Sequence, residues 1–166
     1  MKGEEYMAIV LIRVDDRLIH GQVAAGWSRA TGATHIVVAD DAVAADGTQK
    51  ALLKVATPTG IKSSILSVEG AAELLKGSKL TKDKVIVLVR GPSGLLRLRD
   101  LGIELKQVNI GNVRMADGRQ RLSKEIAATP EEVEQWKTLD SLGIEMTAQW
   151  VPGGPSSSFN QVLRDF

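Results

Sequence analysis

Five side chains that can handle a phosphoryl group lie within eight consecutive residues near the start of the chain. The segment Arg13-Val14-Asp15-Asp16-Arg17-Leu18-Ile19-His20 contains two arginines, two aspartates and a histidine, and Gly21 follows it. A neutral imidazole is a competent nucleophile near pH 7, because its unperturbed pKa is about 6.5. Guanidinium groups bind phosphate oxygens through paired hydrogen bonds. The segment could therefore hold a phosphoryl group, with an imidazole as nucleophile and guanidinium groups to bind the phosphate oxygens.

The same residues also have a structural interpretation. A histidine that follows an apolar pair, as His20 follows Leu18-Ile19, is often a hydrogen-bonded residue at the boundary of an element. Aspartates and arginines in a turn often form weak, solvated ion pairs. Gly21 favours a site, because backbone can approach a ligand where no side chain intervenes, and the amides at the start of a helix attract anions. Residue types alone leave both interpretations open, with Asp15 orienting either the ring or an arginine.

The elements that would position this motif are short apolar runs alternating with helix-like stretches. The runs are rich in Val and Ile and lack polar alternation, which is typical of strands buried on both faces of a parallel sheet. They are Ala8–Val14, Ile36–Ala39, Ile65–Val68, Val85–Val89 and Val108–Ile110. The expected helices are Gly21–Thr31, Ala42–Ala56, Glu69–Lys76 and Ser93–Leu101. This alternation predicts a Rossmann-like α/β fold: one open, mostly parallel twisted sheet with helices on both faces. Sites in such folds lie outside the carboxyl ends of the strands, where the motif stands.

The second half of the chain carries the clearest helix signal. Thr129 offers an N-cap, with Pro130 at the first helical position and Glu132 at N3, where it completes a capping box, and Gly143 fits the position after the helix. Ile144–Val151 then predicts a further strand.

Two loop signals complete the outline. Asp117-Gly118 separates Gln107–Arg114 from Arg119–Glu125, which predicts an antiparallel hairpin at the edge of the sheet. The Pro-, Gly- and Ser-rich stretch 152–158 predicts a loop, and Phe159–Arg164 a short last helix.

Composition narrows the class of protein. A length of 166 residues fits one domain, 1–166, in which Met1–Tyr6 are extra residues before the first strand. The formal net charge of +1 gives no argument for nucleic acid. The absence of cysteine excludes disulfides and thiolate sites, and two histidines provide no metal-ligand cluster. Acidic residues near the N-terminus and short apolar runs predict a cytoplasmic protein, with no cofactor or metal expected.

The stretch Ile12–Val23, with Trp27 close behind, resembles the signature of the mannose/fructose/sorbose family of phosphotransferase system (PTS) enzyme IIB components. That pattern is an arginine, a hydrophobic residue, Asp-Asp/Asn-Arg-Leu-Ile/Val-His-Gly-Gln-Val and then a tryptophan, and the chain matches it without a gap. The likeness continues through Ile36–Asp46, Val108–Asn112 and Leu142–Glu145.

The resemblance implies a phosphoryl carrier. His20 would accept phosphate from a phosphohistidine of the IIA component and pass it to a hexose-type sugar bound by the membrane components IIC and IID. It implies that Arg17 and Arg13 hold the phosphoryl group or meet the IIA component, and that Asp15 supports the site. Peripheral association with the permease follows from these partners, whereas the sugar and the oligomeric state, a homo-oligomer included, stay open.

Two rival functions fit the same motif. One is a phosphohydrolase with a phosphohistidine intermediate, and the other is a regulatory domain that binds a phosphorylated metabolite at Arg13–Gly21. Among the remaining candidates, His35 is expected to be structural, and Asp40 and Asp41 to be caps or turn residues, although they could border the site. Core or strand packing is expected for Trp27, Trp136 and Trp150, and partner docking is the second interpretation of Trp27. Three residues after a strand could approach the same crevice: Asn109, Gly111 and Asn112.

Overall fold

The computed structural model describes residues 7–166, so the predicted extra residues Met1–Tyr6 lie outside its description. The strands of the main sheet are β1 (Ala8–Val14), β2 (His35–Ala39), β3 (Lys62–Leu66), β4 (Lys84–Val89), β5 (Gln107–Ile110), β8 (Glu145–Gln149) and β9 (Ser156–Ser158). They are arranged in the order β3-β2-β4-β1-β5-β8-β9, and every pairing is parallel except that of β8 with β9. The α/β fold with a mostly parallel sheet is thus confirmed.

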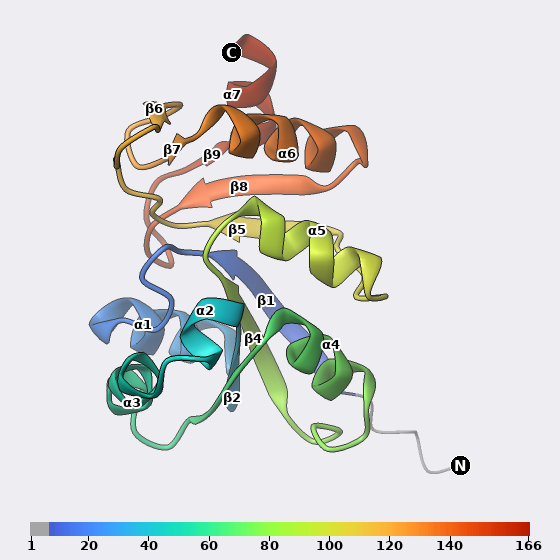
Figure 1. Ribbon diagram of the computed structural model, residues 1–166. Helices are drawn as coiled ribbons and strands as arrows, with labels where there is room; N and C mark the ends of the chain where they lie inside the picture. The colour runs from blue at the N-terminus through green and yellow to red at the C-terminus, as the bar shows by residue number, and fades with distance from the viewer. Residues whose placement is uncertain (1–6) are drawn as a thin grey trace.

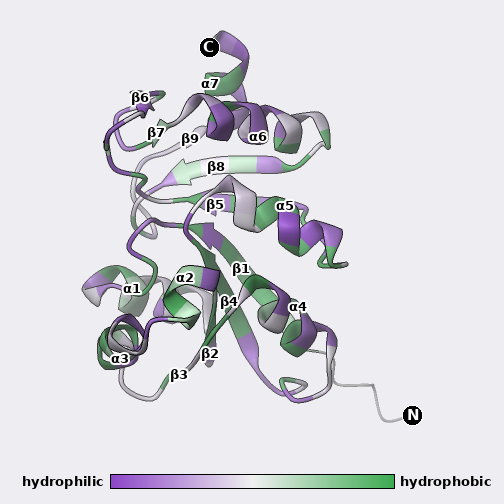
Figure 2. Cartoon of the chain, viewed as in Figure 1, coloured by the Kyte–Doolittle hydropathy of each residue, from purple (hydrophilic) through white to green (hydrophobic). Residues whose placement is uncertain are grey.

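Helices cover both faces of this sheet, and each face has its own core. The helices are α1 (Gly21–Thr31), α2 (Asp41–Ala44), α3 (Gly47–Ala56), α4 (Val68–Lys76), α5 (Pro92–Asp100), α6 (Pro130–Ser141) and α7 (Phe159–Asp165). One core joins β-strand side chains to α4, α5, α6 and α7, and Figure 1 shows α4, α5 and α6 side by side along that face. The other core packs α1, α2 and α3 against the opposite face. Figure 2 shows the hydrophobic character of the central strands β1 and β4, which both cores share.

The position of β1 explains where the motif lies. β1 pairs with β4 along its whole length, and with β5 only at Arg13 and Val14. The chain leaves β1 between the carboxyl ends of its two neighbours, and six residues separate the end of β1 from the start of α1. The fold therefore delivers the motif to a crevice at the carboxyl edge of the sheet, as predicted.

The predicted hairpin around Asp117-Gly118 is wrong. Both edges of β5 are occupied, one by β1 and the other by β8, so no edge remains for a hairpin partner. A small antiparallel sheet forms instead between β6 (Gln120–Arg121) and β7 (Ala127–Ala128), and the antiparallel edge of the main sheet is β9.

Caps explain the other differences in element boundaries. The single helix expected over 42–56 is two helices, because the Asp46 carboxylate accepts hydrogen bonds from the Thr48 and Gln49 amides and starts α3. Ser67 accepts from the Gly70 amide, so Val68 begins α4 and does not extend β3. The predicted capping box of Thr129 is confirmed, and α6 follows it. Across residues 7–166, no helix is long and apolar enough to cross a membrane.

Candidate functional site

Main-chain hydrogen bonds hold the motif loop between β4 and the segment that follows β5. The Asp15 amide donates to the Val89 carbonyl at 3.0 Å, and the Asp16 amide donates to the Asn112 carbonyl at 2.9 Å. His20 occupies the N-cap position of α1 with an extended backbone, and its side chain makes no capping hydrogen bond. The start of the loop is therefore fixed on both sides, while the imidazole at its end stays available for another partner.

The apolar pair Leu18-Ile19 anchors the middle of the loop in the core on the α1 face. Both side chains are buried there, and Leu18 has a φ of +61°, which no other described non-glycine residue shares in sign. Such a left-handed conformation costs a non-glycine residue about 1–2 kcal/mol. The core contacts of Leu18-Ile19 hold the turn in place, and the residues on either side, Arg17 and His20, reach the surface.

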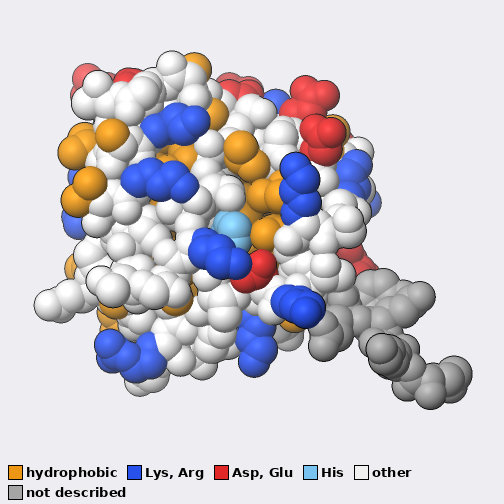
Figure 3. All heavy atoms as spheres, turned by 90° about the horizontal axis from the view of Figure 1, so that it is seen from below, with side chains coloured by type: hydrophobic (Ala, Val, Ile, Leu, Met, Phe, Trp, Pro, Cys, Tyr) orange, Lys and Arg blue, Asp and Glu red, His pale blue; other side chains and the backbone are white. Residues whose placement is uncertain are grey.

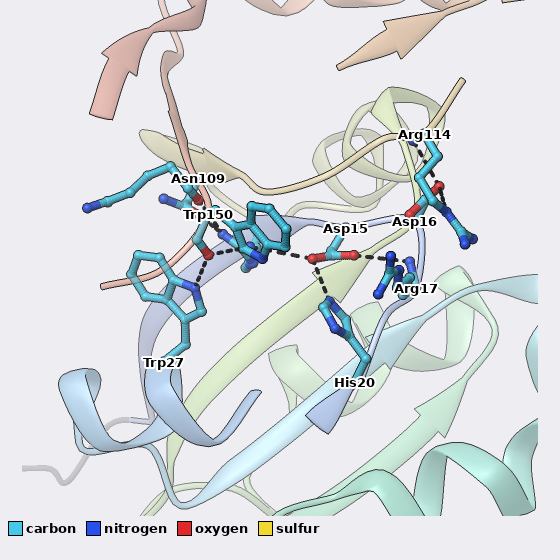
Figure 4. Close-up of polar contacts among 10 residues, drawn as sticks. Asp15, Asp16, Arg17, His20, Trp27, Asn109, Arg114 and Trp150 are labelled. Carbon is cyan, nitrogen blue, oxygen red and sulfur yellow. Dashed lines mark hydrogen bonds and ion pairs between the residues drawn. The ribbon is translucent and has the colours of Figure 1, made fainter. Parts of the chain in front are cut away.

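At the centre of the site, the buried Asp15 carboxylate lies against the partly exposed His20 ring (Figure 4). His20 Nε2 lies 2.9 Å from Asp15 Oδ2, and the side-chain exposures are 21% for His20 and 1% for Asp15. The other carboxylate oxygen, Oδ1, accepts a hydrogen bond from the Arg17 amide at 3.1 Å. Because a carboxylate can only accept, Nε2 carries the ring proton and Nδ1 keeps its lone pair. Asp15 thus orients the ring with Nδ1 free for chemistry.

Arg13 lies behind Asp15 on the same face of β1 and is only 2% exposed. Its guanidinium donates to Asn109 Oδ1, to the Gln149 carbonyl at 2.8 Å and to the Trp150 carbonyl at 2.9 Å. Burial lowers its pKa to about 10, against the opposing effect of Asp15, so it remains protonated at neutral pH. This burial is at odds with the phosphate contact expected for Arg13, because its donors are already engaged inside the protein.

Basic side chains surround the exposed edge of His20. Arg17 is exposed, and within residues 7–166 its guanidinium makes no hydrogen bond or ion pair. Arg114, which the sequence interpretation missed, pairs through Nε with Asp16 Oδ2 at 3.0 Å, and its carbonyl accepts from Arg119. Figure 3 shows a histidine on a face where lysine and arginine side chains gather. The site is therefore an open, positively charged surface, to which Arg17 can bring a free guanidinium.

Gly21, the predicted point of close backbone approach, begins α1 with a φ of +40°. A β-carbon at this position would meet nothing within 4 Å, so the space above the backbone is open. The first amides of a helix have no acceptor within the helix, so those of α1 can serve as donors to an anion.

The other sequence candidates fall into two groups. His35 is buried at the amino end of β2, with Nε2 2.8 Å from Ser64 Oγ, and burial lowers its pKa. Asp40 caps α2, and Asp41 accepts from the Val68 amide. These three are structural, as the sequence indicates. In contrast, the segment 109–112 does reach the site: Asn109 contacts Arg13, and Asn112 binds the Asp16 amide.

Two of the three tryptophans are buried, and the third is exposed. Trp136 is fully buried and packs edge-on against Phe159. Trp27 is buried with its ring 5.1 Å from the Arg13 guanidinium carbon, and its Nε1 donates to the Trp150 carbonyl at 3.0 Å. The expected packing role of Trp150 is wrong, because it follows β8 in a loop with 48% of its surface exposed.

A groove of about 920 Å³ opens where β1 and β5 diverge toward their amino ends. Its lining includes Leu11, Trp27, Asn109 and Gln149 but not His20. His20 therefore lies outside this groove, on the open surface at the carboxyl edge of the sheet. No cluster of three or more metal-ligating side chains occurs in the part of the chain that the structure describes.

Comparison with known proteins gives one consistent answer. A family model described as PTS system sorbose subfamily IIB component matches residues 9–165. The PTS system fructose-specific EIIB component of Bacillus subtilis (strain 168) is 31% identical over 159 residues, which cover 96% of this chain and 98% of that protein. The PTS system mannose-specific EIIAB component of Escherichia coli (strain K12) is 32% identical over 155 residues, 93% of this chain and 48% of that protein. The solved IIBSor domain of the sorbose permease from Klebsiella pneumoniae superposes with a TM-score of 0.90 at 30% identity, covering 96% and 98% of the two chains.

Proposed function

The chain belongs to the sorbose subfamily of PTS IIB components, and from this premise we propose that it carries phosphoryl groups on His20. As a member of this family it is a sugar-specific phosphotransferase component. The proposal assigns the carrier step to His20, the phosphoryl donor to a phosphorylated IIA component, and the acceptor to a hexose-type sugar taken up through IIC and IID. A cytoplasmic location beside the membrane permease is part of the same proposal.

One observation carries this proposal: an exposed imidazole is fixed by a buried carboxylate beside a free arginine. His20 Nδ1 has a lone pair because Nε2 donates to Asp15. In-line attack by Nδ1 on the phosphorus of the donor phosphohistidine forms one P–N bond while the donor P–N bond breaks, and the bonding electrons return to the donor ring. The His20 ring gains positive charge in this step, and the adjacent Asp15 carboxylate stabilises it.

Arg17 and the start of α1 would hold the transferring group. Phosphoryl transfer depends mainly on positioning and on stabilising negative charge on the oxygens. Arg17 stands three residues before His20 and has its guanidinium free, and the open backbone at Gly21 adds amide donors. The two sources of positive charge flank the imidazole, so a phosphoryl group on Nδ1 would lie between them.

Arg17, Arg114 and Arg119 form an arginine rim. Arg114 pairs with Asp16 and Arg119 pairs with Glu132, so Arg17 is the member of this rim whose guanidinium is free for an acidic surface on a phosphorylated partner. Complementary charge speeds encounter and favours short-lived complexes, which a carrier serving two partners requires. The relative from Escherichia coli is named an EIIAB component, and this chain matches 48% of its length. We propose that the IIA partner of this chain docks on the same rim.

Incubation with a phosphorylated IIA component tests the proposal directly. We expect one phosphoryl group per chain, with the acid lability and base stability of a phosphorus–nitrogen bond. Intact-mass measurement gives the number of phosphoryl groups per chain. Repeating it after acid and after base treatment tests the stability of the bond. Release of inorganic phosphate from simple phosphomonoesters would instead favour the phosphohydrolase, and a stable metabolite complex without transfer would favour the regulatory domain.

Phosphoryl transfer is also expected to proceed without a divalent metal on this chain. Positive charge for the transferring oxygens comes from guanidinium and amide groups, which do the work that a metal does elsewhere. The measurement is the rate of transfer from purified phospho-IIA in excess chelator. Strong inhibition that one particular metal reverses would contradict this expectation.

A further inference from the structure

Gly111 leaves an empty position against which the Arg13 guanidinium packs. A β-carbon at residue 111 would overlap the guanidinium, lying 2.5 Å from Cζ, and would lie 2.9 Å from Asp15 Oδ2. The backbone itself does not demand glycine, because Gly111 is outside the left-handed region and its amide makes a regular 2.8 Å bond to the Val14 carbonyl. The absence of a side chain at residue 111 is therefore explained by the Arg13 guanidinium beside it.

Three acceptors besides Asp15, together with one aromatic ring, hold the Arg13 guanidinium. Asn109, on β5, and the carbonyls of Gln149 and Trp150, after β8, accept its hydrogen bonds, and the Trp27 ring covers its face. These partners are 96, 136 and 137 residues away in the sequence. The guanidinium is thus a fixed buried cation, and its Nη2 lies 3.4 Å from Asp15 Oδ2.

The same oxygen, Asp15 Oδ2, lies 2.9 Å from His20 Nε2. We infer that Arg13 and Gly111 are positioning residues for phosphoryl transfer: the bare backbone at Gly111 lets Arg13 sit behind Asp15, and Arg13 holds Asp15 against His20. The inference rests on the proposed carrier role of His20 and deepens it. Neither residue touches the phosphoryl group, so both act on the orientation of the imidazole alone.

Gly111→Ala is the direct test, with Gly47→Ala as its matched control. Gly47 begins α3, and a β-carbon there would meet nothing within 4 Å, so the control adds the same methyl group in open space. Gly111→Ala should lower the turnover of phospho-IIA about 10-fold, which corresponds to about 1.4 kcal/mol. The Michaelis constant for phospho-IIA should stay unchanged, because the docking rim is untouched. Gly47→Ala should match the wild type in both constants.

A spectroscopic readout separates this role from a general loss of structure. The hydrogen bond to Asp15 protects the His20 Nε2–H proton, so in Gly111→Ala this proton should exchange with water faster, while backbone amide exchange in β1 and β4 stays as in the wild type. Asn109→Ala is the second variant, because it removes one acceptor of the Arg13 guanidinium without adding an atom near it, and it should change turnover and ring-proton exchange in the same direction.

The inference would be overturned if Gly111→Ala and Asn109→Ala both had the same turnover and the same ring-proton exchange rate as the wild type. Failure of the wild-type chain to accept phosphate from phospho-IIA would be a different result, since it would refute the carrier function itself. The ring-proton measurement needs no partner, so it still tests the Arg13–Asp15–His20 connection in that case. A cycle with Arg13→Ala adds a check: once the guanidinium is gone, Gly111→Ala should have little further effect on turnover.

Discussion

His20→Ala is expected to abolish phosphorylation by phospho-IIA. The substitution removes the nucleophilic nitrogen, and the neighbouring Asp15 is buried and hydrogen-bonded, so it cannot take over the attack. His20 is only partly buried and makes no capping bond, so its loss should leave folding intact. The measurement is incorporation of the phosphoryl group by intact mass, together with circular dichroism to establish that the variant is folded.

His35→Ala is the matched control, because His35 is the other histidine of the chain. His35 lies at the amino end of β2, whereas His20 follows the carboxyl end of β1, and the two strands run in the same direction. The two rings are thus at opposite edges of the sheet. His35→Ala should retain labelling even if it lowers stability by removing the bond to Ser64. Labelling that survives in His20→Ala and disappears in His35→Ala would reverse the assignment.

Arg17→Ala should slow phosphoryl transfer far more than it weakens folding. A charge-assisted hydrogen bond contributes about 1.5–3 kcal/mol. Losing one in the transition state would slow transfer by roughly 10- to 150-fold, at about 1.4 kcal/mol per decade. The Arg17 side chain is exposed and its amide, which Asp15 binds, survives the substitution. The melting temperature should therefore change little, because exposed substitutions usually stay within about 0.5 kcal/mol.

Arg17→Lys keeps the charge of Arg17 but loses the planar pair of donors, so it should retain part of the activity. Measuring the transfer rate and thermal unfolding of both variants side by side separates a phosphate ligand from a turn residue. A normal rate with a large loss of stability in Arg17→Ala would assign Arg17 to the turn. The phosphoryl group would then depend on the backbone of α1, since Arg13 is engaged in the interior.

Local signals accounted for most elements of the fold. The strands β1 and β4 contain unbroken runs of Val, Ile and Leu, residues 9–12 and 85–89, and the capping box of Thr129 predicted the start of α6. Each of these signals is complete within a few residues, so it predicts the element without knowledge of the segments that pack against it. The strand Ser156–Ser158 gave no such signal, because three exposed serines have no apolar pattern and form a strand only by pairing with the free edge of β8.

The hairpin expected around Asp117-Gly118 failed for a related reason. An Asp-Gly pair reports the local preference of the backbone for a turn, and the chain does turn there. Which strands then pair depends on which edges are free, and β1 and β8 occupy both edges of β5. The residues on either side of the turn carry no information about which distant strands occupy the edges of β5.

The sequence by itself determined the family motif and its setting: a histidine after the first strand of an α/β chain, with arginines beside it. It did not distinguish the two arginines, because both carry the same charge within eight residues of His20. Only the tertiary structure decided that Arg17 faces solvent while Arg13 turns inward to Asn109 and the carbonyls of Gln149 and Trp150. Strand alternation places Arg13 and Asp15 on one face of β1, but what covers that face comes from β5 and β8, which only folding brings there.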